Sequence, residues 1–487
     1  MKRFFILTLA LCLVACKPVA HQNEIQFSVA QMPLNLDPRY ATDAASERVN
    51  RLIYQPMVNF DTASKPLPIL ASWRAVNDAE YLFTLNKNLA LFHHNKPLTA
   101  MDVKATYDSL LALKDSPNTA EFNNIKNIEM INENSLVFHL KQADKHFPSK
   151  LIIGILPKDL IQQGHDFSHN PVGNGALKFV SWQNKLLLQR ISDGQMVALT
   201  EVKDPTVRML KLLRGEADLI QGDLPPELVK YLQSKSEINV KTSVGANFSY
   251  LGLNFQDMVL QNLKVRQAMM HAIDRQAIID KVMVKNTRIA SAILPPEHYA
   301  GNAELPPYDY DPALAKKLLL EAGIKLPLKL VYKTSIDAQR VRFATILQAQ
   351  MQPAGIDLEI RSLDWGTFFE DVKQGNFQLF GLTWVGIKTP EIYNKAFGSQ
   401  SFPPNGFNRG RYVDAKLDKL LTNEDWPAAT KRIQAQLPYI PLWYEGQFAA
   451  MQKNISHYSP KPDGNWDDLK TVTRTVIKSS DTISHAD

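Results

Sequence analysis

The two cysteines of this 487-residue chain, Cys12 and Cys16, both lie within its first sixteen residues. A basic dipeptide and an apolar run over residues 4–14 precede Cys16, and this run is too short to cross a bilayer as a helix. The arrangement predicts an export signal. Because residues 17–487 contain no thiol, the exported chain has to be stable without disulfides, through the apolar cores that a chain of this length can bury.

The end of the apolar run is more specific than a general export signal. Leu13, Val14, Ala15 and Cys16 form a tetrad that resembles the bacterial lipobox, in which a peptidase cuts before an acylated cysteine. The resemblance implies a lipoprotein signal peptide over residues 1–15 and a lipid anchor on Cys16. Because a single acyl chain holds a protein to a membrane only marginally, dual or triple acylation would make the anchor stable. An ordinary signal peptide that happens to contain a cysteine is the alternative.

Composition places the body of the chain outside the bilayer. Hydrophobic residues make up 45% and charged residues 21%, and no second run of about 18 apolar residues follows the signal. The formal net charge of +6 comes from interspersed charges of both signs, without blocks. This pattern gives no indication of nucleic-acid binding, and a solvated surface of mixed sign accounts for it.

Alternation and capping signals predict a mixture of strands and helices. The expected elements are strands over residues 81–85 and 135–140 with a helix over 99–113 between them, a helix that begins at Asp311-Pro312 and ends at Gly323, and a strand, helix and strand over 328–332, 337–351 and 356–360. The last three form a β-α-β unit, which packs a helix on a largely parallel sheet. Because no low-complexity linker is present, any domain boundary has to be a compact crossover.

Short enzyme motifs are missing from the chain. We find no G-x-S-x-G, H-E-x-x-H or phosphate-binding P-loop pattern, and no C-x-x-C in residues 17–487. The adjacent pair His93-His94 would point to opposite faces of a strand or turn, so we expect no shared metal there. We predict a binding protein without catalytic residues, cofactor or metal. Because carboxylate-based hydrolases carry no short motif, an exported hydrolase on the same scaffold stays open.

Ordered sequence blocks extend over nearly the whole chain after the signal. They are LNLDP at 34–38, IYQPMVNF at 53–60, PILASW at 68–73, FHHNKPLTAMDV at 92–103, GEAD at 215–218, VRQAMMHAID at 265–274, YDP at 310–312, GLTW at 381–384 and IPLW at 440–443. In order and spacing they resemble the family 5 extracellular solute-binding proteins of bacterial ABC importers, which bind dipeptides, oligopeptides or nickel. The block at 92–103 is the most specific, because it matches a family pattern F-H-D-G-x-P-L-T-A-x-D-V.

The resemblance implies an α/β, bilobal periplasmic-binding-protein-like fold of type II, in the large peptide-binding class with an inserted subdomain. The implied divisions are lobe I over residues 16–45, 166–242 and 441–487, the inserted subdomain over 46–165, and lobe II over 243–440, with hinge crossings near 243–250 and 437–443. Two lobes that close around a hinge bury a solute between them.

The implied function is solute capture outside the cytoplasm. A monomeric lipoprotein, anchored at the periplasmic or cell-surface side of a membrane, would deliver a peptide or peptide-like solute to the transmembrane permease subunits of an ABC importer. A sensory or envelope-interaction protein on the same scaffold, or a receptor for a non-peptide solute, stays open.

The resemblance to the family indicates seven residues of this chain as candidates for ligand contact. They are Met32, Leu34, Asn247, Tyr250, Trp384, Ile387 and Tyr444. Trp384 matches the tryptophan that lines the cavity in relatives, and an indole offers an apolar wall and one hydrogen-bond donor. A tryptophan in the core of the second lobe is the alternative for Trp384, and ordinary strand positions are the alternative for Asn247 and Tyr250.

Position 387 departs from the family pattern. Peptide-binding relatives have an aspartate three residues after the tryptophan, where it forms a salt bridge with the peptide's amino terminus, but this chain has Ile387. A buried ammonium without a counter-ion would cost several kcal/mol. Either another acid such as Glu391 meets the amine, or the ligand has no free amino terminus.

Overall fold

The computed structural model describes residues 24–475, apart from residues 42, 62–63 and 404–405. The predicted signal peptide and Cys16 lie outside the described residues, so that both stay predictions. Among the helices that are described, none is long and apolar enough to cross a membrane.

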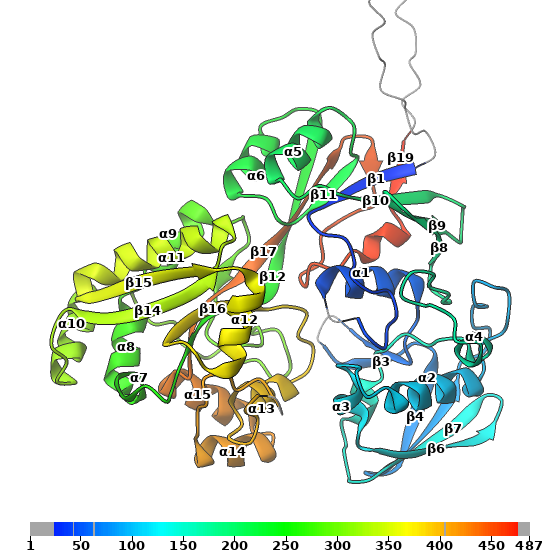
Figure 1. The fold of residues 1–487 in the computed structure, drawn as a ribbon, viewed down its shortest axis with the longest axis horizontal. Helices are drawn as coiled ribbons and strands as arrows, with labels where there is room; N and C mark the ends of the chain where they lie inside the picture. Colours follow the sequence, from blue (N-terminus) through cyan, green and yellow to red (C-terminus); the bar gives the residue numbers. More distant parts are fainter. Residues whose placement is uncertain (1–23, 42, 62–63, 404–405, 476–487) are drawn as a thin grey trace, which may run out of the picture.

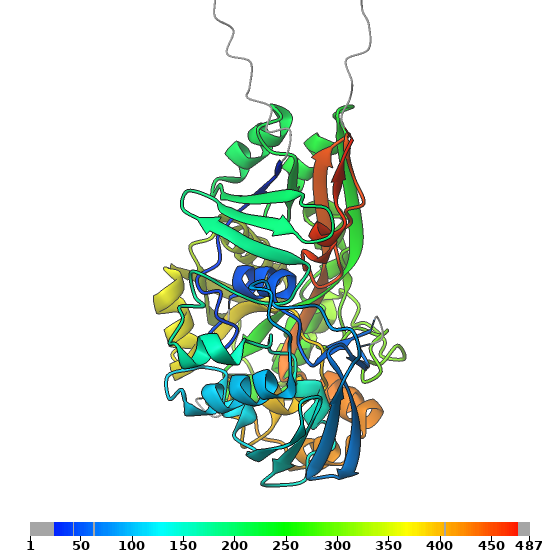
Figure 2. The same cartoon turned by 90° about the vertical axis from the view of Figure 1, so that its right-hand side faces the viewer.

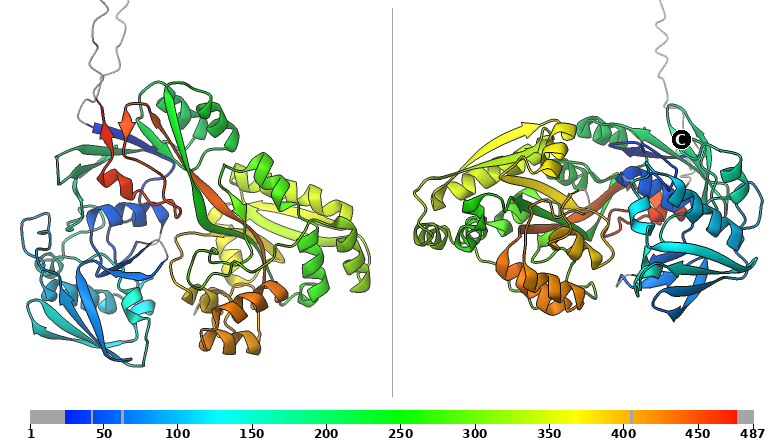
Figure 3. Two further views of the ribbon diagram at one scale, coloured as in Figure 1. Left: turned by 180° about the vertical axis from the view of Figure 1, so that it is seen from behind. Right: turned by 60° about the horizontal axis from the view of Figure 1, so that its bottom comes forward.

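An eleven-stranded sheet runs through the described part of the molecule (Figure 1). Its strand order is β15-β14-β16-β12-β17-β11-β1-β10-β9-β8, and β13 pairs with β17 beside this path. The strands are β1 Glu24–Val29, β8 Leu177–Trp182, β9 Leu186–Arg190, β10 Met196–Glu201, β11 Leu219–Gln221, β12 Ile238–Leu253, β13 Arg288–Ile289, β14 Leu328–Ser335, β15 Ile356–Leu363, β16 Leu379–Trp384 and β17 Tyr439–Gln452. Two lobes form around the two ends of this sheet (Figure 3).

Strands β12 and β17 belong to both lobes. They pair antiparallel from Ile238 with Gln452 to Gly252 with Tyr439, and Figure 2 shows them side by side through much of the height of the molecule. The pairing shifts register between Ser243 and Asn247, where a bulge bends the strands. Gly245 lies in this bulge, and a Cβ atom there would stand 1.5 Å from the carbonyl oxygen of Glu445. Only glycine allows this close approach of the two backbones.

The first lobe is built on β1 and its neighbours. β1 is parallel to both β10 and β11, and helix α1 (Ala44–Ile53) packs beneath them, while α5 (Pro205–Leu213) and α6 (Pro226–Gln233) cover the strands near β11. Phe27 of β1 meets the ring of Trp466 edge to face at 4.9 Å between centroids. Both side chains are almost fully buried, and apolar burial of this size contributes about 1.5–3 kcal/mol for each side chain. The remaining elements here are β18 Ile455–Ser456, η3 Asp467–Lys470 and β19 Thr473–Arg474.

A subdomain with its own core follows α1. Its four-stranded sheet has the order β4-β5-β7-β6 and is covered by α2. The elements are β2 Val58–Phe60, β3 Pro66–Pro68, β4 Ala71–Asn77, β5 Glu80–Leu85, α2 Ala100–Ala112, α3 Thr119–Phe122, β6 Ile125–Asn132, β7 Ser135–Leu140, η1 Phe147–Lys150 and α4 Lys158–Gln162. The predicted strands at 81–85 and 135–140 are confirmed, as is the capped start of α2, where the Thr99 backbone N–H donates to Asp102 at 2.8 Å.

The second lobe surrounds β14, β15 and β16 with helices on both faces. These helices are α7 Met258–Gln261, α8 Leu263–His271, α9 Arg275–Val282, α10 Pro312–Glu321, α11 Ala338–Met351, η2 Gln352–Ala354, α12 Trp365–Gln374, α13 Glu391–Phe397, α14 Ala415–Thr422 and α15 Trp426–Gln436. The predicted β-α-β unit is confirmed, because β14 and β15 pair parallel from Leu328 with Ile356 and α11 lies between them in the chain. Asp311 caps the predicted helix α10 by accepting a hydrogen bond from Leu314.

Candidate functional site

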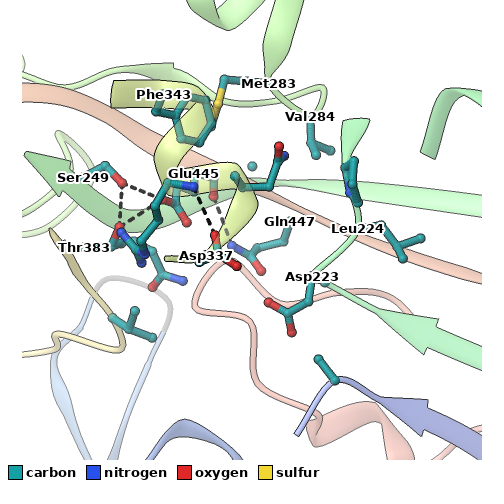
Figure 4. Close-up of a pocket in the computed structure, with 18 of the residues that line it drawn as sticks. Asp223, Leu224, Ser249, Met283, Val284, Asp337, Phe343, Thr383, Glu445 and Gln447 are labelled. Atoms are coloured by element: carbon teal, nitrogen blue, oxygen red, sulfur yellow. Dashed lines mark hydrogen bonds between the residues drawn. The ribbon is translucent and has the colours of Figure 1, made fainter. Parts of the chain in front are cut away.

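A cavity of about 670 Å³ lies between the two lobes, against the crossing strands (Figure 4). The first lobe contributes residues 29–31 after β1, the start of α5 and the segment 221–226. The second lobe contributes residues 282–284, the first turns of α11 and the end of β16. The floor is formed by Asn247, Ser249 and Tyr250 of β12 and by β17 between residues 442 and 448. The cavity is therefore assembled from segments spread over most of the chain.

One carboxylate and two hydroxyl groups form a cluster on this floor. Ser249 of β12 and Thr383 of β16 both donate hydrogen bonds to Oε1 of Glu445 on β17, the second at 3.0 Å (Figure 4). The two hydroxyl oxygens lie 2.8 Å apart. Ser249 and Thr383 are direct partners in the sheet, so strand alternation places both on the face that the cavity covers.

Two arginines bring positive charge to the same cavity. Arg340 lies in the first turn of α11, where its backbone N–H donates to the N-cap residue Asp337 at 3.0 Å. Arg340 also lines the cavity. Arg48 of α1 places its guanidinium 5.3 Å from the centre of the Trp466 ring. Across the part of the chain that the structure describes, neither guanidinium forms an ion pair with a protein carboxylate. The cavity therefore holds charges of both signs.

Arg208 has a structural role at the cavity wall. Its side chain is only 1% exposed and donates to the backbone carbonyl oxygens of Val202, Lys203 and Asp223. Burial lowers the pKa of Arg208, and the nearby carboxylate of Asp223 opposes that shift. These bonds fix the loops that shape the first-lobe wall.

A second cavity of about 630 Å³ adjoins the first, with Arg48 and Val385 lining both. Its walls come from α1, from the inserted subdomain near Phe60 and Ile152, and from the loop after β16. On α1, Asn50 is 7% exposed, and neither atom of its amide has a hydrogen-bond partner. This wall therefore carries a buried amide that is free to donate and accept.

Ion pairs connect the second lobe to the rest of the molecule around the cavities. Lys388, in the loop after β16, contacts Asp463 of the first lobe at 2.6 Å. Burial raises the pKa of Asp463, but the Lys388 ammonium outweighs it and holds this pKa below its ordinary value. Further ion pairs between the parts are Arg342 with Glu227, Lys150 with Glu391, Lys395 with Glu121, and Lys145 with Glu424. The His146 ring also contacts Glu424, at 2.7 Å.

Two of the predicted ligand residues border the first cavity. Asn247 is 4% exposed, and its side-chain oxygen accepts a hydrogen bond from Gly386 at 3.2 Å. Tyr250 also borders the cavity, but its ring stacks on Tyr439 at 4.1 Å, and its hydroxyl accepts from Arg409. Burial raises the pKa of Tyr250. The structure therefore brings the backbone of this strand to the cavity and directs the Tyr250 ring into the core.

Tyr444 is buried in the second-lobe core, Trp384 and Ile387 are partly buried against that core, and none of the three lines either cavity. Trp384 pairs with Phe248 in the sheet, so its ring lies on the face opposite to Ser249 and Thr383. The Tyr444 hydroxyl contacts the backbone carbonyl oxygens of Ala292, at 2.6 Å, and Leu294, at 3.0 Å, as their hydrogen-bond donor. Ligand contact by these three side chains stays a prediction.

Met32 and Leu34 follow β1 at the edge of the site. The backbone N–H of Met32 donates to Glu201 at 3.3 Å, and that of Leu34 donates to Ser46 at 3.0 Å. The Leu34 side chain is 69% exposed. Neither residue lines either cavity, and residues 29–31 just before them do. Glu391, named as one alternative for the aspartate missing at 387, lines neither cavity and lies 3.9 Å from Lys150.

Sequence reasoning missed the polar residues that the cavities bring together. These are Arg48, Asn50, Ser249, Arg340, Thr383 and Glu445. Glu445 follows Tyr444 in a strand, and alternation alone would have placed it on the other face from that tyrosine. In the described ranges, no three His, Cys, Asp or Glu side chains converge as a candidate metal site.

Comparisons with known proteins match the chain over most of its length. The family model described as "Bacterial extracellular solute-binding proteins, family 5 Middle" matches residues 65–402. "Di/tripeptide-binding protein 1" of Pseudomonas aeruginosa is 25% identical, over 94% of this chain and 95% of that protein. "Glutathione-binding protein GsiB" of Salmonella choleraesuis is 26% identical, over 92% of this chain and 94% of that protein. Among solved structures, NikZ from Campylobacter jejuni in complex with Ni(L-His) superposes with a TM-score of 0.78 at 22% identity, covering 93% of this chain and 99% of that chain.

Proposed function

Because this chain belongs to the bacterial extracellular solute-binding proteins of family 5, we propose that it captures a peptide or peptide-like solute and delivers it to the permease of an ABC importer. The likeness to solved structures confirms the predicted fold class, a bilobal periplasmic-binding-protein-like α/β fold. The proposal adds a ligand class, a partner and an anchor: it describes a monomer held at the outer face of a membrane by the acylated Cys16.

The cavity between the lobes is the observation that carries this proposal. Its volume of about 670 Å³ lies within the usual range of about 300–1,000 Å³ for small-molecule sites. It combines a carboxylate at Glu445 with guanidinium groups at Arg48 and Arg340. A zwitterionic solute of the size of a short peptide suits walls that carry both charges.

The adjoining cavity supports a ligand with amide groups. Asn50 presents an amide without hydrogen-bond partners, and a peptide group both donates and accepts. A buried polar group of this kind gains free energy when a ligand supplies the missing bonds. We propose that the ligand extends from the first cavity toward Asn50, past Arg48 and Val385, which line both cavities.

The crossing strands support closure of the lobes as the mode of capture. The register shift between Ser243 and Asn247 provides a bend in β12, and Lys388 reaches from the second lobe to Asp463. Closing of the lobes would bury the ligand and bring such ion pairs together. We therefore propose that the lobes divide at 243–250 and 437–443, as expected from the sequence. The inserted subdomain, expected at 46–165, would move with the first lobe, whose core includes helix α1.

Binding without turnover distinguishes a receptor from a hydrolase on the same scaffold. The relatives from Pseudomonas aeruginosa and Salmonella choleraesuis both have the names of binding proteins. The test is calorimetry with free peptides of two to eight residues, together with small-angle scattering and chromatography of the peptide afterwards. We expect saturable binding, a smaller radius of gyration and an intact peptide. A constant radius with cleaved peptide would contradict the proposal.

A further inference from the structure

The Glu445 carboxylate has an unusual environment for an acid between two lobes. One of its oxygens, Oε1, accepts hydrogen bonds from both Ser249 and Thr383 (Figure 4). These two bonds hold the carboxylate in one orientation on the cavity floor. For the other oxygen, Oε2, the described residues provide neither a hydrogen-bond donor nor a paired cation. The carboxylate is therefore positioned but not neutralised.

The surroundings of Glu445 limit how water could compensate it once the lobes close. The residue is partly buried already, and Ser249 beside it is 5% exposed. Trp443, on the same strand face, is 2% exposed and lines the cavity, with its indole N–H lacking a hydrogen-bond partner. A carboxylate that loses its hydration without gaining a cation is strongly unfavourable. Capture of a ligand therefore requires a positive charge near Oε2.

On this basis we propose that Glu445 binds a positively charged group of the ligand, an ammonium, and thereby selects solutes that carry one. The inference rests on the proposed function and specifies its ligand: a peptide with a free amino group, held by charge-assisted hydrogen bonds to Glu445. The partnerless indole N–H of Trp443 is available for an acceptor of the same ligand, such as a carbonyl oxygen. Glu445 would then perform the role that an aspartate has in peptide-binding relatives at the position of Ile387.

A cation from the protein itself is the competing arrangement. Arg340 lines the same cavity and lies on α11. This helix belongs to the second lobe, as does Thr383, which donates a hydrogen bond to Glu445. If Arg340 neutralised Glu445 in the closed form, the ligand would need no ammonium. The two arrangements differ in one measurable respect, which is whether affinity depends on the charge of the ligand's amine.

The test compares two peptide pools and three proteins. The pools are mixed-sequence tripeptides with free amino termini and the same tripeptides after N-acetylation. The proteins are the full-length wild type, Glu445→Gln, which keeps the size and an acceptor oxygen, and Glu237→Gln. Glu237 is an exposed acid that lines neither cavity, so its variant makes the same chemical change away from the site.

We expect the wild type and Glu237→Gln to bind the free pool at least tenfold more tightly than the acetylated pool, a difference of about 1.4 kcal/mol. Glu445→Gln should lose at least tenfold for the free pool and show no preference between the pools. Equal affinity of wild type and Glu445→Gln for the free pool would overturn the role of Glu445 and leave the peptide proposal standing. Absence of binding of either pool to the wild type would overturn both.

Discussion

The ion pair between Lys388 and Asp463 joins the lobes, and removing its cation should shift the protein toward an open form. Exposed ion pairs are worth roughly 0.2–1 kcal/mol, and removal of one partner from a fully buried pair costs roughly 3–5 kcal/mol. This pair is intermediate, because the Lys388 side chain is 30% exposed and that of Asp463 is 10% exposed. Asn465 still donates two hydrogen bonds to Asp463 in the absence of Lys388. For Lys388→Met we therefore expect a loss of about 1–2 kcal/mol of closure free energy, a roughly five- to thirtyfold shift of the equilibrium.

Fluorescence energy transfer between the lobes would measure this shift. Because residues 17–487 contain no cysteine, dyes can be placed on Lys126→Cys in the inserted subdomain and Lys416→Cys in the second lobe, both of which are exposed. A double-mutant cycle of Lys388→Met with Asp463→Asn isolates the pairwise energy.

The matched control for this pair is Lys461→Met. Lys461 forms an ion pair with Asp468 at 2.6 Å within the first lobe, so its loss should leave closure unchanged. A coupling energy of zero in the double-mutant cycle, or an equal effect of Lys461→Met, would refute the assignment of Lys388 as a contact that favours closure.

Three further perturbations test other parts of the account. Cys16→Ser should abolish the incorporation of radiolabelled fatty acid and leave an uncleaved precursor. Normal labelling and processing of this variant would refute the anchor. Gly245→Ala should destabilise the protein by about 1–3 kcal/mol, because its Cβ would stand 1.5 Å from a backbone oxygen; the melting temperature should fall well below that of Gly366→Ala, whose Cβ would meet its nearest atom at 3.3 Å. Lys388 lowers the pKa of Asp463 when the two are paired. The ion pair should therefore contribute its full free energy to lobe closure at pH values above the ordinary carboxyl pKa. This contribution should be lost as the pH falls through the lowered pKa of Asp463. Energy transfer that is unchanged on acidification would contradict this last expectation.

Local signals in the sequence predicted the elements well where a single side chain determines a boundary. Thr99, Asp311 and Asp337 each precede a helix at the expected position. Asp311 and Asp337 each accept a hydrogen bond from a backbone N–H of the first turn, and at Thr99 the backbone N–H donates to Asp102 inside the helix. The parallel pairing of β14 with β15 followed from the strand-helix-strand order. Such features depend on residues near in the sequence, so no knowledge of the rest of the fold was needed.

The cavity residues could not be predicted in the same way, because register and distant segments decide them. Trp384 and Thr383 are neighbours, and only their pairing with Phe248 and Ser249 determines which side chain faces the cavity. A shift of one residue would exchange the two faces. Arg48 comes from α1, far from Glu445 in the sequence, and a lone charged residue on a helix is typical of a solvated surface.

Native mass spectrometry of the exported protein, purified without refolding, tests the central proposal most directly. Closed lobes retain a bound solute through purification, and denaturation then releases it for fragmentation. The account predicts a retained solute that contains peptide bonds and a free ammonium group, present in wild type and depleted in Glu445→Gln. A retained solute that has neither a peptide bond nor a positive charge would contradict it.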